Sequence, residues 1–381
     1  MPEYAMGPDD TGAAESAYAV VIPTLGRPSL NATLRAVADA EGPKPERVVL
    51  VDDRPGTDGT TPLPVEIPAA LRPLTSVVRG EARGPAAARN TGWRAAGRAP
   101  WIVFLDDDVV PGPTWCDDLA LDLAAATAED GTMGTAGTAG TTGTVGAVTA
   151  RIDVPLPVGR RPTDWERNTA GLATARWITA DMAYRREALE TVGGFDERFR
   201  RAFREDADLA LRALAAGWSV TAGTRTTAHP VRPADRWISV RLQRGNADDV
   251  LMTRLHGRDW WTRAAAPRGR LPRHLAVTAA AAAALACAAL RKPAAATVCA
   301  TAWLAGTAEF ALARILPGPR DREEVLTMAA TSVLIPPAAV WHWLRGQITY
   351  RTAAPLDPYA GTPGHPPGMP QRVLGDERIR R

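Results

Sequence analysis

Three consecutive carboxylates follow an apolar run in the first third of the chain. Residues 101–105 read Trp-Ile-Val-Phe-Leu, and Asp106, Asp107 and Asp108 come directly after them. Five apolar residues in a row are typical of a strand that is buried on both faces of a parallel sheet. The acids would then lie at the carboxyl end of that strand, which is the edge where open α/β sheets bind their ligands.

Carboxylates at this spacing repel one another, and each raises the pKa of its neighbours unless a positive charge lies among them. Mg²⁺ and Mn²⁺ prefer such oxygen ligands and commonly bridge to the phosphates of a substrate. The alternative is an acidic helix N-cap, since Pro111 and Pro113 follow and a helix is expected from about residue 114. One acid is enough for a cap, so three acids favour a metal site.

A second group of acids, Glu205, Asp206 and Asp208, begins a predicted helix that Gly217 ends. The helix dipole alone favours acidic side chains at a helix N-terminus, so a purely structural role is open for this group. Asp208 shares a helical face with Arg212, which favours a structural ion pair for Asp208.

Short apolar runs alternate with helix-like stretches over the first 230 residues. This alternation predicts an α/β fold with a Rossmann-like, mostly parallel sheet flanked by helices. No Gly-x-Gly-x-x-Gly follows the first strand and no Gly-Lys-Ser/Thr loop occurs, which disfavours a dinucleotide fold and a P-loop NTPase. The expected strands are residues 18–22, 47–51, 75–78, 101–105, 145–152, 177–184 and 218–221, and the expected helices include 29–40, 84–97 and 185–192.

The composition excludes some classes of function. Forty-five basic residues against 42 acidic ones give a net charge of +3 in 381 residues, so no strong field indicates nucleic acid as a partner. Cys116, Cys287 and Cys299 have no paired spacing, which argues against a zinc site or a disulfide framework and suggests a reducing compartment.

Six motifs in the same order resemble the family 2 glycosyltransferases of the GT-A fold. This resemblance implies an inverting enzyme that uses a nucleotide-activated sugar, with a UDP-sugar as the favoured donor, and a divalent cation, Mn²⁺ or Mg²⁺. The motifs are Val21-Ile22-Pro23, Val51-Asp52-Asp53, Ala88-Arg89-Asn90-Thr91-Gly92, Phe104-Leu105-Asp106-Asp107-Asp108, Gly193-Gly194-Phe195-Asp196-Glu197 and Glu205-Asp206.

The resemblance also implies roles in binding the donor. Asp52 would accept the N3 proton of a pyrimidine base, and Pro23 and Thr24 would line the base pocket. Asp106 would face the ribose. Arg89, Asn90 and Asp107 are assigned to the donor site as well.

The metal would be bound by Asp108, with Asp106 and His229 as further ligands in the same resemblance. A lone histidine is more often an ordinary packed residue, so both interpretations of His229 are open. Five arginines surround it and could neutralise a diphosphate or a phosphorylated lipid acceptor, although a solvated basic face is the default. They are Arg225, Arg232, Arg236, Arg241 and Arg244.

Asp206 would be the general base. Inversion needs one carboxylate on the face opposite the leaving group, where it takes the proton of the acceptor hydroxyl. The basic pair Arg185 and Arg186 could contact the acceptor or be structural. No Gln-x-x-Arg-Trp motif of processive relatives is present, which favours transfer of a single sugar.

Three apolar segments, 275–290, 294–316 and 325–344, follow the last motif. A membrane-spanning helix needs about 20 apolar residues, so the second and third are long enough and the first is too short. Two crossings would leave Arg291, Lys292 and the Arg-rich tail on the cytosolic side, in line with the positive-inside rule. Glu309 is costly in lipid, so a soluble hairpin or an interfacial anchor is the alternative. We expect attachment to the cytoplasmic face of the membrane, where nucleotide sugars occur.

The expected organisation is a disordered leader (1–16), a GT-A domain (17–269) with a low-complexity insertion (131–146), a helical membrane-associated region (270–346) and a flexible tail (347–381). The acceptor would be a glycan or a lipid-linked molecule of the cell envelope. Two other functions are open. One is a nucleotidyltransferase, although residues 23–27 offer only one glycine and one arginine for a loop that would bind a triphosphate. The other is a non-catalytic membrane scaffold.

Overall fold

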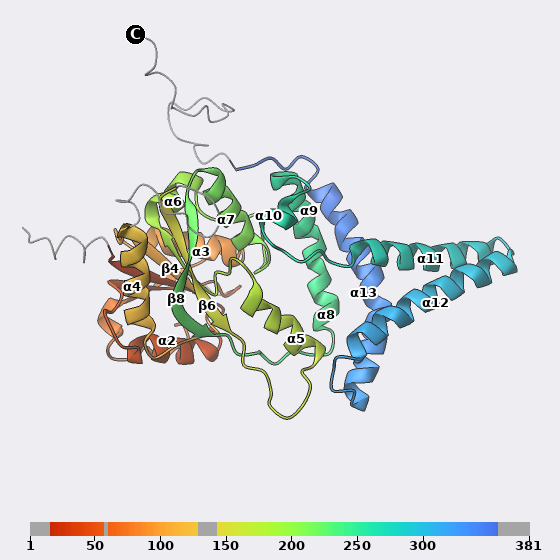
Figure 1. Cartoon of the computed structure of the whole chain (residues 1–381), viewed down its shortest axis with the longest axis horizontal. Helices are drawn as coiled ribbons and strands as arrows, with labels where there is room; N and C mark the ends of the chain where they lie inside the picture. The colour runs from red at the N-terminus through yellow and green to blue at the C-terminus, as the bar shows by residue number, and fades with distance from the viewer. Residues whose placement is uncertain (1–15, 57–59, 129–142, 357–381) are drawn as a thin grey trace, which may run out of the picture.

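An eight-stranded sheet forms the centre of the N-terminal domain (Figure 1). The computed structural model describes residues 16–56, 60–128 and 143–356. The strand order is β3-β2-β1-β4-β7-β6-β8-β5. The strands are β1 (Tyr18–Thr24), β2 (Arg47–Asp52), β3 (Thr75–Arg79), β4 (Trp101–Leu105), β5 (Val110–Pro111), β6 (Val145–Asp153), β7 (Asp181–Arg185) and β8 (Ser219–Ala228).

The sheet is parallel in its first half and mixed in its second. β1, β2, β3 and β4 run in one direction, whereas β7 is antiparallel to both β4 and β6. The register places Asp181, the first residue of β7, opposite Leu105, the last residue of β4. The carboxyl ends of β1, β2 and β4 and the start of β7 therefore meet at one edge of the sheet.

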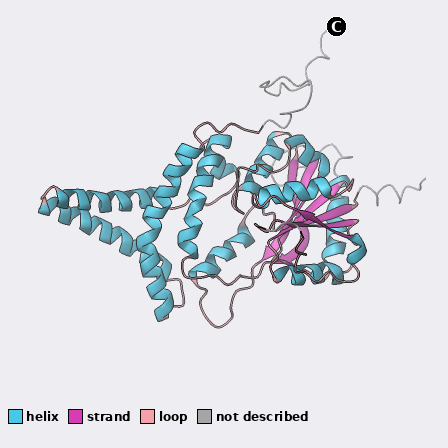
Figure 2. Cartoon of the chain, turned by 180° about the vertical axis from the view of Figure 1, so that it is seen from behind, coloured by secondary structure: helices cyan, strands magenta, loops and turns pink. Residues whose placement is uncertain are grey.

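Helices cover both faces of the sheet, as the view from behind shows (Figure 2). Side chains alternate along a strand, so Val20 and Ile22 of β1 face one layer while Ala19 and Val21 face the other, all four fully buried. The first layer is formed by α2 (Ser29–Asp39) and α4 (Trp115–Ala128), and the second by α3 (Pro85–Ala95), α6 (Arg186–Val192) and α7 (Glu205–Ala215).

Some elements differ from the sequence-based expectation. The expected strand 177–184 begins only at Asp181, because residues 179 and 180 form a turn although Trp177 and Ile178 are buried. Trp177 and Ile178 are buried but do not pair with a neighbouring strand, so their apolar side chains give the same sequence pattern as a strand. Further short elements were not predicted: α5 (Asp164–Ala170), α8 (Ile238–Arg241), η4 (Leu242–Arg244), α9 (Gly245–His256) and α10 (Trp260–Arg263), with η1 (Arg72–Leu74) and η3 (Gly171–Thr174).

Three long apolar helices follow the domain: α11 (Leu271–Ala289), α12 (Pro293–Ile315) and α13 (Arg322–Thr349). α11 and α12 form an antiparallel hairpin that projects away from the sheet, whereas α13 lies along α9 (Figures 1 and 2). The contact with α9 is close, since a Cβ atom at Gly346 would lie 2.8 Å from Ala247 Cα.

All three helices are long and apolar enough to cross a membrane. The expectation that the first segment is too short was wrong, because α11 begins at Leu271 and has 19 residues. The Pro336-Pro337 pair lies inside α13, which continues through it to Thr349.

Several expected segments fall largely outside the described residues. These are the leader, residues 131–142 of the low-complexity insertion, and the tail from residue 357 onward. Val145 and Gly146, at the end of the expected insertion, already belong to β6.

A buried ion network fixes β8 against β7 and α4. The Arg225 side chain is completely buried; its Nε donates to Asp181 Oδ1 at 2.9 Å and its Nη1 to Asp122 Oδ2 at 3.0 Å. Asp181 also accepts from Trp115 Nε1 at 2.6 Å and from Thr227 Oγ1 at 2.5 Å. The network thus sets the position of the end of β8 relative to the end of β4.

We expect the substitution Arg225→Met to destabilise the fold by about 3–5 kcal/mol, because it leaves two buried carboxylates without their cation. The matched control is Arg160→Met, which removes an exposed partner of Glu166 and should leave the unfolding midpoint nearly unchanged, because surface ion pairs contribute little to stability. Thermal unfolding of the two variants in detergent measures the difference. Equal unfolding midpoints would contradict the role given to Arg225.

Candidate functional site

The carboxylates that follow β4 meet His229 beyond the end of β8. One ligand atom from each of Asp106, Asp108 and His229 lies within 4.8 Å of the other two. His229 is positioned by its backbone N–H, which donates to Asp153 O at the end of β6. Two carboxylates and an imidazole are competent ligands for Mn²⁺ or Mg²⁺. The structure therefore brings together the three residues that the sequence nominated for a metal.

The donor set fits a divalent cation. Asp108 Oδ2 is buried and accepts no hydrogen bond from the described residues. Arg232 Nε lies 2.8 Å from that oxygen as an ion pair, but from the exposed side of the site. Burial and the nearby Asp106 carboxylate raise the pKa of Asp108, and Arg232 and His229 only partly offset this. A cation bound between Asp106 and Asp108 would relieve the repulsion between these two carboxylates.

A single arginine connects the two acid clusters. Arg89, in α3, is completely buried, and its Nη2 donates to Asp106 Oδ1 at 2.7 Å while its Nη1 donates to Glu205 Oε1 at 2.8 Å. The guanidinium also lies over the ring of Phe195 at 5.6 Å. Acids that are far apart in the chain are thus joined by one buried guanidinium. Because both ends of Arg89 are engaged, we revise its assignment from donor binding to holding the two acid clusters together.

The Asp206 carboxylate has no ion-pair partner among the described residues. Its Oδ1 accepts the backbone N–H of Ala207, whereas the neighbouring Glu205 is engaged by Arg89. Desolvation raises the pKa of Asp206, and Asp106 raises it further, while Arg89 and Arg204 lower it. Burial raises the pKa of Glu205 to about 8, with Asp206 as the second cause and Arg89 opposing both. Of the two neighbouring acids, Glu205 is therefore the one that is paired with an arginine, and Asp206 is not.

The start of α7 is held by a residue that sequence analysis missed. Arg204 has a positive φ of 77°, an uncommon conformation for a residue other than glycine. Its guanidinium lies over the rings of Phe203, Trp260 and Trp261, and its Nε donates to Asp249 Oδ1 at 2.9 Å. The Trp260-Trp261 pair was the available signal, but only the fold brings it next to Arg204.

The residues assigned to the base lie at neighbouring strand ends. Thr24 of β1 pairs in register with Asp52 of β2. Both oxygens of Asp52 are engaged by Arg54, through Nε at 2.8 Å and Nη2 at 2.7 Å, and this arginine lowers the pKa of Asp52. A base would have to displace Arg54 to reach Asp52. Pro23, next to Thr24, lies at the same edge of the sheet.

Asp107 points toward β1 rather than toward the metal ligands. Its Oδ2 accepts from Thr24 Oγ1 at 2.7 Å and its Oδ1 from Arg27 Nη1 at 2.8 Å. Thr24 Oγ1 in turn accepts from Gly26 N at 3.0 Å. Asp107 therefore shapes the loop after β1, and the Thr24 hydroxyl already donates to it.

Asn90 has no free hydrogen-bonding group for a donor. Its Nδ2 donates to Phe195 O at 2.9 Å and to Glu197 Oε1 at 2.8 Å, and its Oδ1 accepts from Phe195 N and Trp93 Nε1. Gly194 (φ +76°) lies so close that an added Cβ would overlap Asn90 Oδ1. We revise the donor-binding assignment: Asn90 anchors the segment 193–197 to α3.

The structural interpretation of Asp208 is confirmed. Its Oδ2 accepts from Arg212 Nη2 at 2.7 Å, and its Oδ1 lies 2.8 Å from His256 Nε2.

Arg185 pairs in register with Trp101 at the start of β4, so it lies at the edge of the sheet opposite to Asp106. An acceptor contact is therefore excluded for Arg185.

The five arginines near His229 are not one basic face. Arg225 is buried in its ion network and Arg241 pairs with Asp235 at 2.7 Å. Arg232 pairs with Asp108. The default expectation of a solvated basic face was wrong for Arg225, which is buried, whereas Arg241 is exposed. A neutralising role is disfavoured for both, because each is paired with a carboxylate of the protein.

The mixed sheet with its acids at one edge defines an α/β domain of the GT-A type. Residues 19–193 match the family described as Glycosyl transferase family 2. The match to family 2 glycosyltransferases therefore extends from β1 to the end of α6. Among curated proteins, no sequence matches the chain.

Three solved structures are similar to the chain. A mannosyltransferase from Pyrobaculum calidifontis, PcManGT in complex with GDP-Man and Mn²⁺, has 19% identity and a TM-score of 0.46, with 88% of each chain covered. GalNAc-T7 with UDP, GalNAc and Mn²⁺ has 15% identity and a TM-score of 0.41, covering 64% of this chain and 52% of that one. S. aureus TarS 1-349 with UDP-GlcNAc has 15% identity and a TM-score of 0.38, covering 88% and 91%. At TM-scores below 0.5, these similarities carry no argument for the function of the chain.

We expect the acid limb of the pH profile to depend on Arg89. Asp206 must be deprotonated to accept a proton, and burial raises its pKa, so activity is lost as the pH falls through this raised value. Arg89 lowers that pKa, so Arg89→Met should move the acid limb of kcat/KM to higher pH. The control is Arg83→Met, a half-buried arginine that pairs with Glu81 and Glu197. An unchanged limb in Arg89→Met would contradict the coupling.

Proposed function

We propose that the chain transfers a single sugar from a nucleotide-sugar donor, with a UDP-sugar favoured, to an acceptor hydroxyl with inversion at the anomeric carbon. The observation that carries the proposal is the Asp206 carboxylate, which has no ion-pair partner among the described residues and follows Glu205, one of the two acids that Arg89 joins. The acceptor oxygen bonds to the anomeric carbon as the bond from that carbon to the diphosphate oxygen breaks. The hydroxyl proton passes to Asp206, so charges and atoms balance.

The remaining side chains position the donor. Asp106, Asp108 and His229 would hold a divalent cation, which when bound stabilises the charge on the departing diphosphate. The diphosphate then needs no proton donor, and one base is sufficient. Thr24 and Asp52 at the ends of β1 and β2 bound the place for the base, at the same edge of the sheet.

The two other functions receive less support. A nucleotidyltransferase needs free basic groups in its first loop, and Arg27 there is paired with Asp107 at 2.8 Å. A non-catalytic scaffold does not need a proton acceptor. The Asp206 carboxylate nevertheless has no ion-pair partner among the described residues.

The proposal places the hairpin of α11 and α12 in the membrane, with the catalytic domain on the cytoplasmic face. Only 6% and 11% of the apolar windows of α11 and α12 are buried against protein, compared with 33% for α13. Since α13 packs on α9, the two crossings are assigned to the first and second helices instead of the second and third. Arginines are more numerous at the base of the hairpin than at its turn, in line with the positive-inside rule. They are Arg268, Arg270, Arg273, Arg320 and Arg322, against Arg291 and Lys292 at the turn.

For the catalytic role, we expect Asp206→Asn to lower kcat for Mn²⁺-dependent UDP-hexose hydrolysis by about 10²–10⁴-fold, because the proton acceptor is lost. KM for the donor should change little, and a chelator should abolish hydrolysis by the unaltered chain. The control is Glu187→Gln, an exposed acid in the first turn of α6. Unchanged turnover in Asp206→Asn would remove this residue from the mechanism.

For membrane attachment, we expect the full chain to stay in the membrane pellet after a carbonate wash. The double variant Val298→Asp, Leu304→Asp should move to the supernatant, because it places two charges on exposed apolar positions of α12. Leu121→Asp, at an exposed leucine of α4, should remain in the pellet. Release of the unaltered chain by carbonate would rule out spanning.

A further inference from the structure

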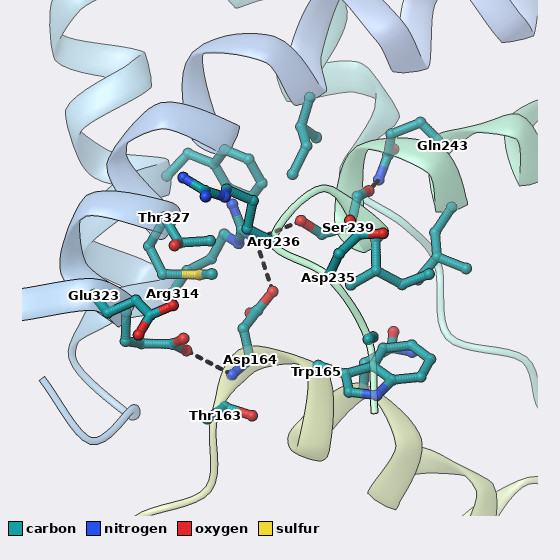
Figure 3. A pocket seen from close by; sticks show the side chains of 18 of the residues that line it. Thr163, Asp164, Trp165, Asp235, Arg236, Ser239, Gln243, Arg314, Glu323 and Thr327 are labelled. Carbon is teal, nitrogen blue, oxygen red and sulfur yellow. Dashed lines mark hydrogen bonds and ion pairs between the residues drawn. The ribbon is translucent and has the colours of Figure 1, made fainter. Parts of the chain in front are cut away.

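A polar cavity of about 480 Å³ lies between the catalytic domain and the C-terminal helices (Figure 3). One wall is formed by α5 with Asp164 and Trp165, and by α8 with Ser239. The facing wall is formed by the end of α12 with Arg314 and the start of α13 with Thr327. The cavity thus exists only because the helical region packs against the domain.

A second cavity, of about 330 Å³, adjoins the first. Arg236, Glu323 and Thr327 line both. The second cavity is otherwise mainly apolar and runs along α13 past Leu326 and Ala330. The two cavities together, which we call the α13 cleft, lead from a polar chamber to an apolar groove beside the membrane helices.

The polar chamber carries more negative than positive charge. Arg314 is fully engaged: Nη1 donates to Thr331 Oγ1 at 2.7 Å, and Nη2 donates to Asp164 Oδ2 at 2.7 Å and to Ser239 Oγ at 3.0 Å. An added anion would find Arg236 as the uncommitted cation among five carboxylates. These are Asp164, Asp235, Asp321, Glu323 and Glu324.

Two polar groups in the cleft are available to a ligand. Among the described residues, Arg236 and Glu323 form no hydrogen bond or ion pair. One is a donor and the other an acceptor, and both line the boundary between the two cavities. Hydroxyl groups can satisfy both at once, because each hydroxyl donates and accepts.

The cleft is connected to the candidate metal site by one loop. Trp165, in the wall of the polar chamber, donates its Nε1 to Arg232 O at 2.7 Å. Arg232 Nε lies 2.8 Å from Asp108 Oδ2. The segment 229–236 therefore carries His229 at one end and the lining residue Arg236 at the other.

We propose that the α13 cleft binds a membrane amphiphile with a neutral, hydroxyl-rich head and an apolar chain, beside the site of the proposed sugar transfer. This inference goes beyond the proposed function, since neither cavity is lined by Asp206 or by the three candidate metal ligands. The head occupies the polar chamber, where carboxylates and an aromatic wall suit hydroxyl groups, and the chain lies in the groove along α13. A phosphate head is disfavoured because it would enter a chamber with an excess of carboxylates.

The test uses the full chain in phospholipid nanodiscs and isothermal titration with octyl β-glucoside, after subtraction of the signal from empty nanodiscs. Octyl phosphate has the same chain with an anionic head. We expect saturable binding of octyl β-glucoside, and binding of octyl phosphate at least ten-fold weaker. Thr327→Trp, which fills the boundary between the cavities, should weaken glucoside binding at least ten-fold. Ala330→Trp, at an exposed position in the apolar groove, should weaken glucoside binding in the same way.

The matched control is Ala329→Trp, an exposed position of α13 outside both cavities, which should bind octyl β-glucoside as the unaltered chain does. Equal binding by the Thr327 and Ala330 variants, tighter binding of octyl phosphate, or no saturable binding would each overturn the proposal. Mn²⁺-dependent UDP-hexose hydrolysis by the unaltered chain is measured in parallel. If the unaltered chain does not hydrolyse UDP-hexose, the proposed function is refuted. If it hydrolyses UDP-hexose but does not bind octyl β-glucoside, only the proposal for the α13 cleft is refuted.

Discussion

The buried guanidinium of Arg89 is the interaction on which the site depends. It bonds at once to Asp106, after β4, and to Glu205, at the start of α7. Without this cation, the buried Glu205 and the partly exposed Asp106 would lose their ion-pair partner, and an unpaired buried charge is costly. Arg89 engages Glu205 but not the adjacent Asp206. The two ion pairs of Arg89 therefore join the acid clusters and distinguish Glu205 from Asp206.

The surrounding fold keeps Arg89 and its partners in place. Asn90, the next residue of α3, holds the segment 193–197 through four hydrogen bonds. Arg204 starts α7 in a left-handed conformation that aromatic rings and Asp249 stabilise. Arg89 and Asn90, which the sequence assigned to donor binding, thus bind other parts of the protein. A preorganised site needs such rigid supports as well as groups that face the substrate.

The C-terminal helices have two different relations to the catalytic domain. The hairpin of α11 and α12 leaves most of its apolar surface uncovered, whereas α13 packs on α9 and helps to line a cavity with α5 and α8. α13 thus joins the part of the chain suited to lipid to the part that carries the acids. This arrangement gives a physical reason for a helical region that is continuous with a sugar-transferring domain.

The sequence by itself determined the sheet-forming runs, the placement of Asp106 and Asp108 after a buried strand, and the nomination of His229 and Asp206, because apolar periodicity and acid spacing are local properties. Only the tertiary structure decided which charged groups are committed to each other. Arg225 and Arg241 look alike in the sequence, yet one is buried and the other exposed. Strand direction, the Arg89 bridge and the packing of α13 likewise depend on partners far away in the chain, and no local pattern encodes a distant partner.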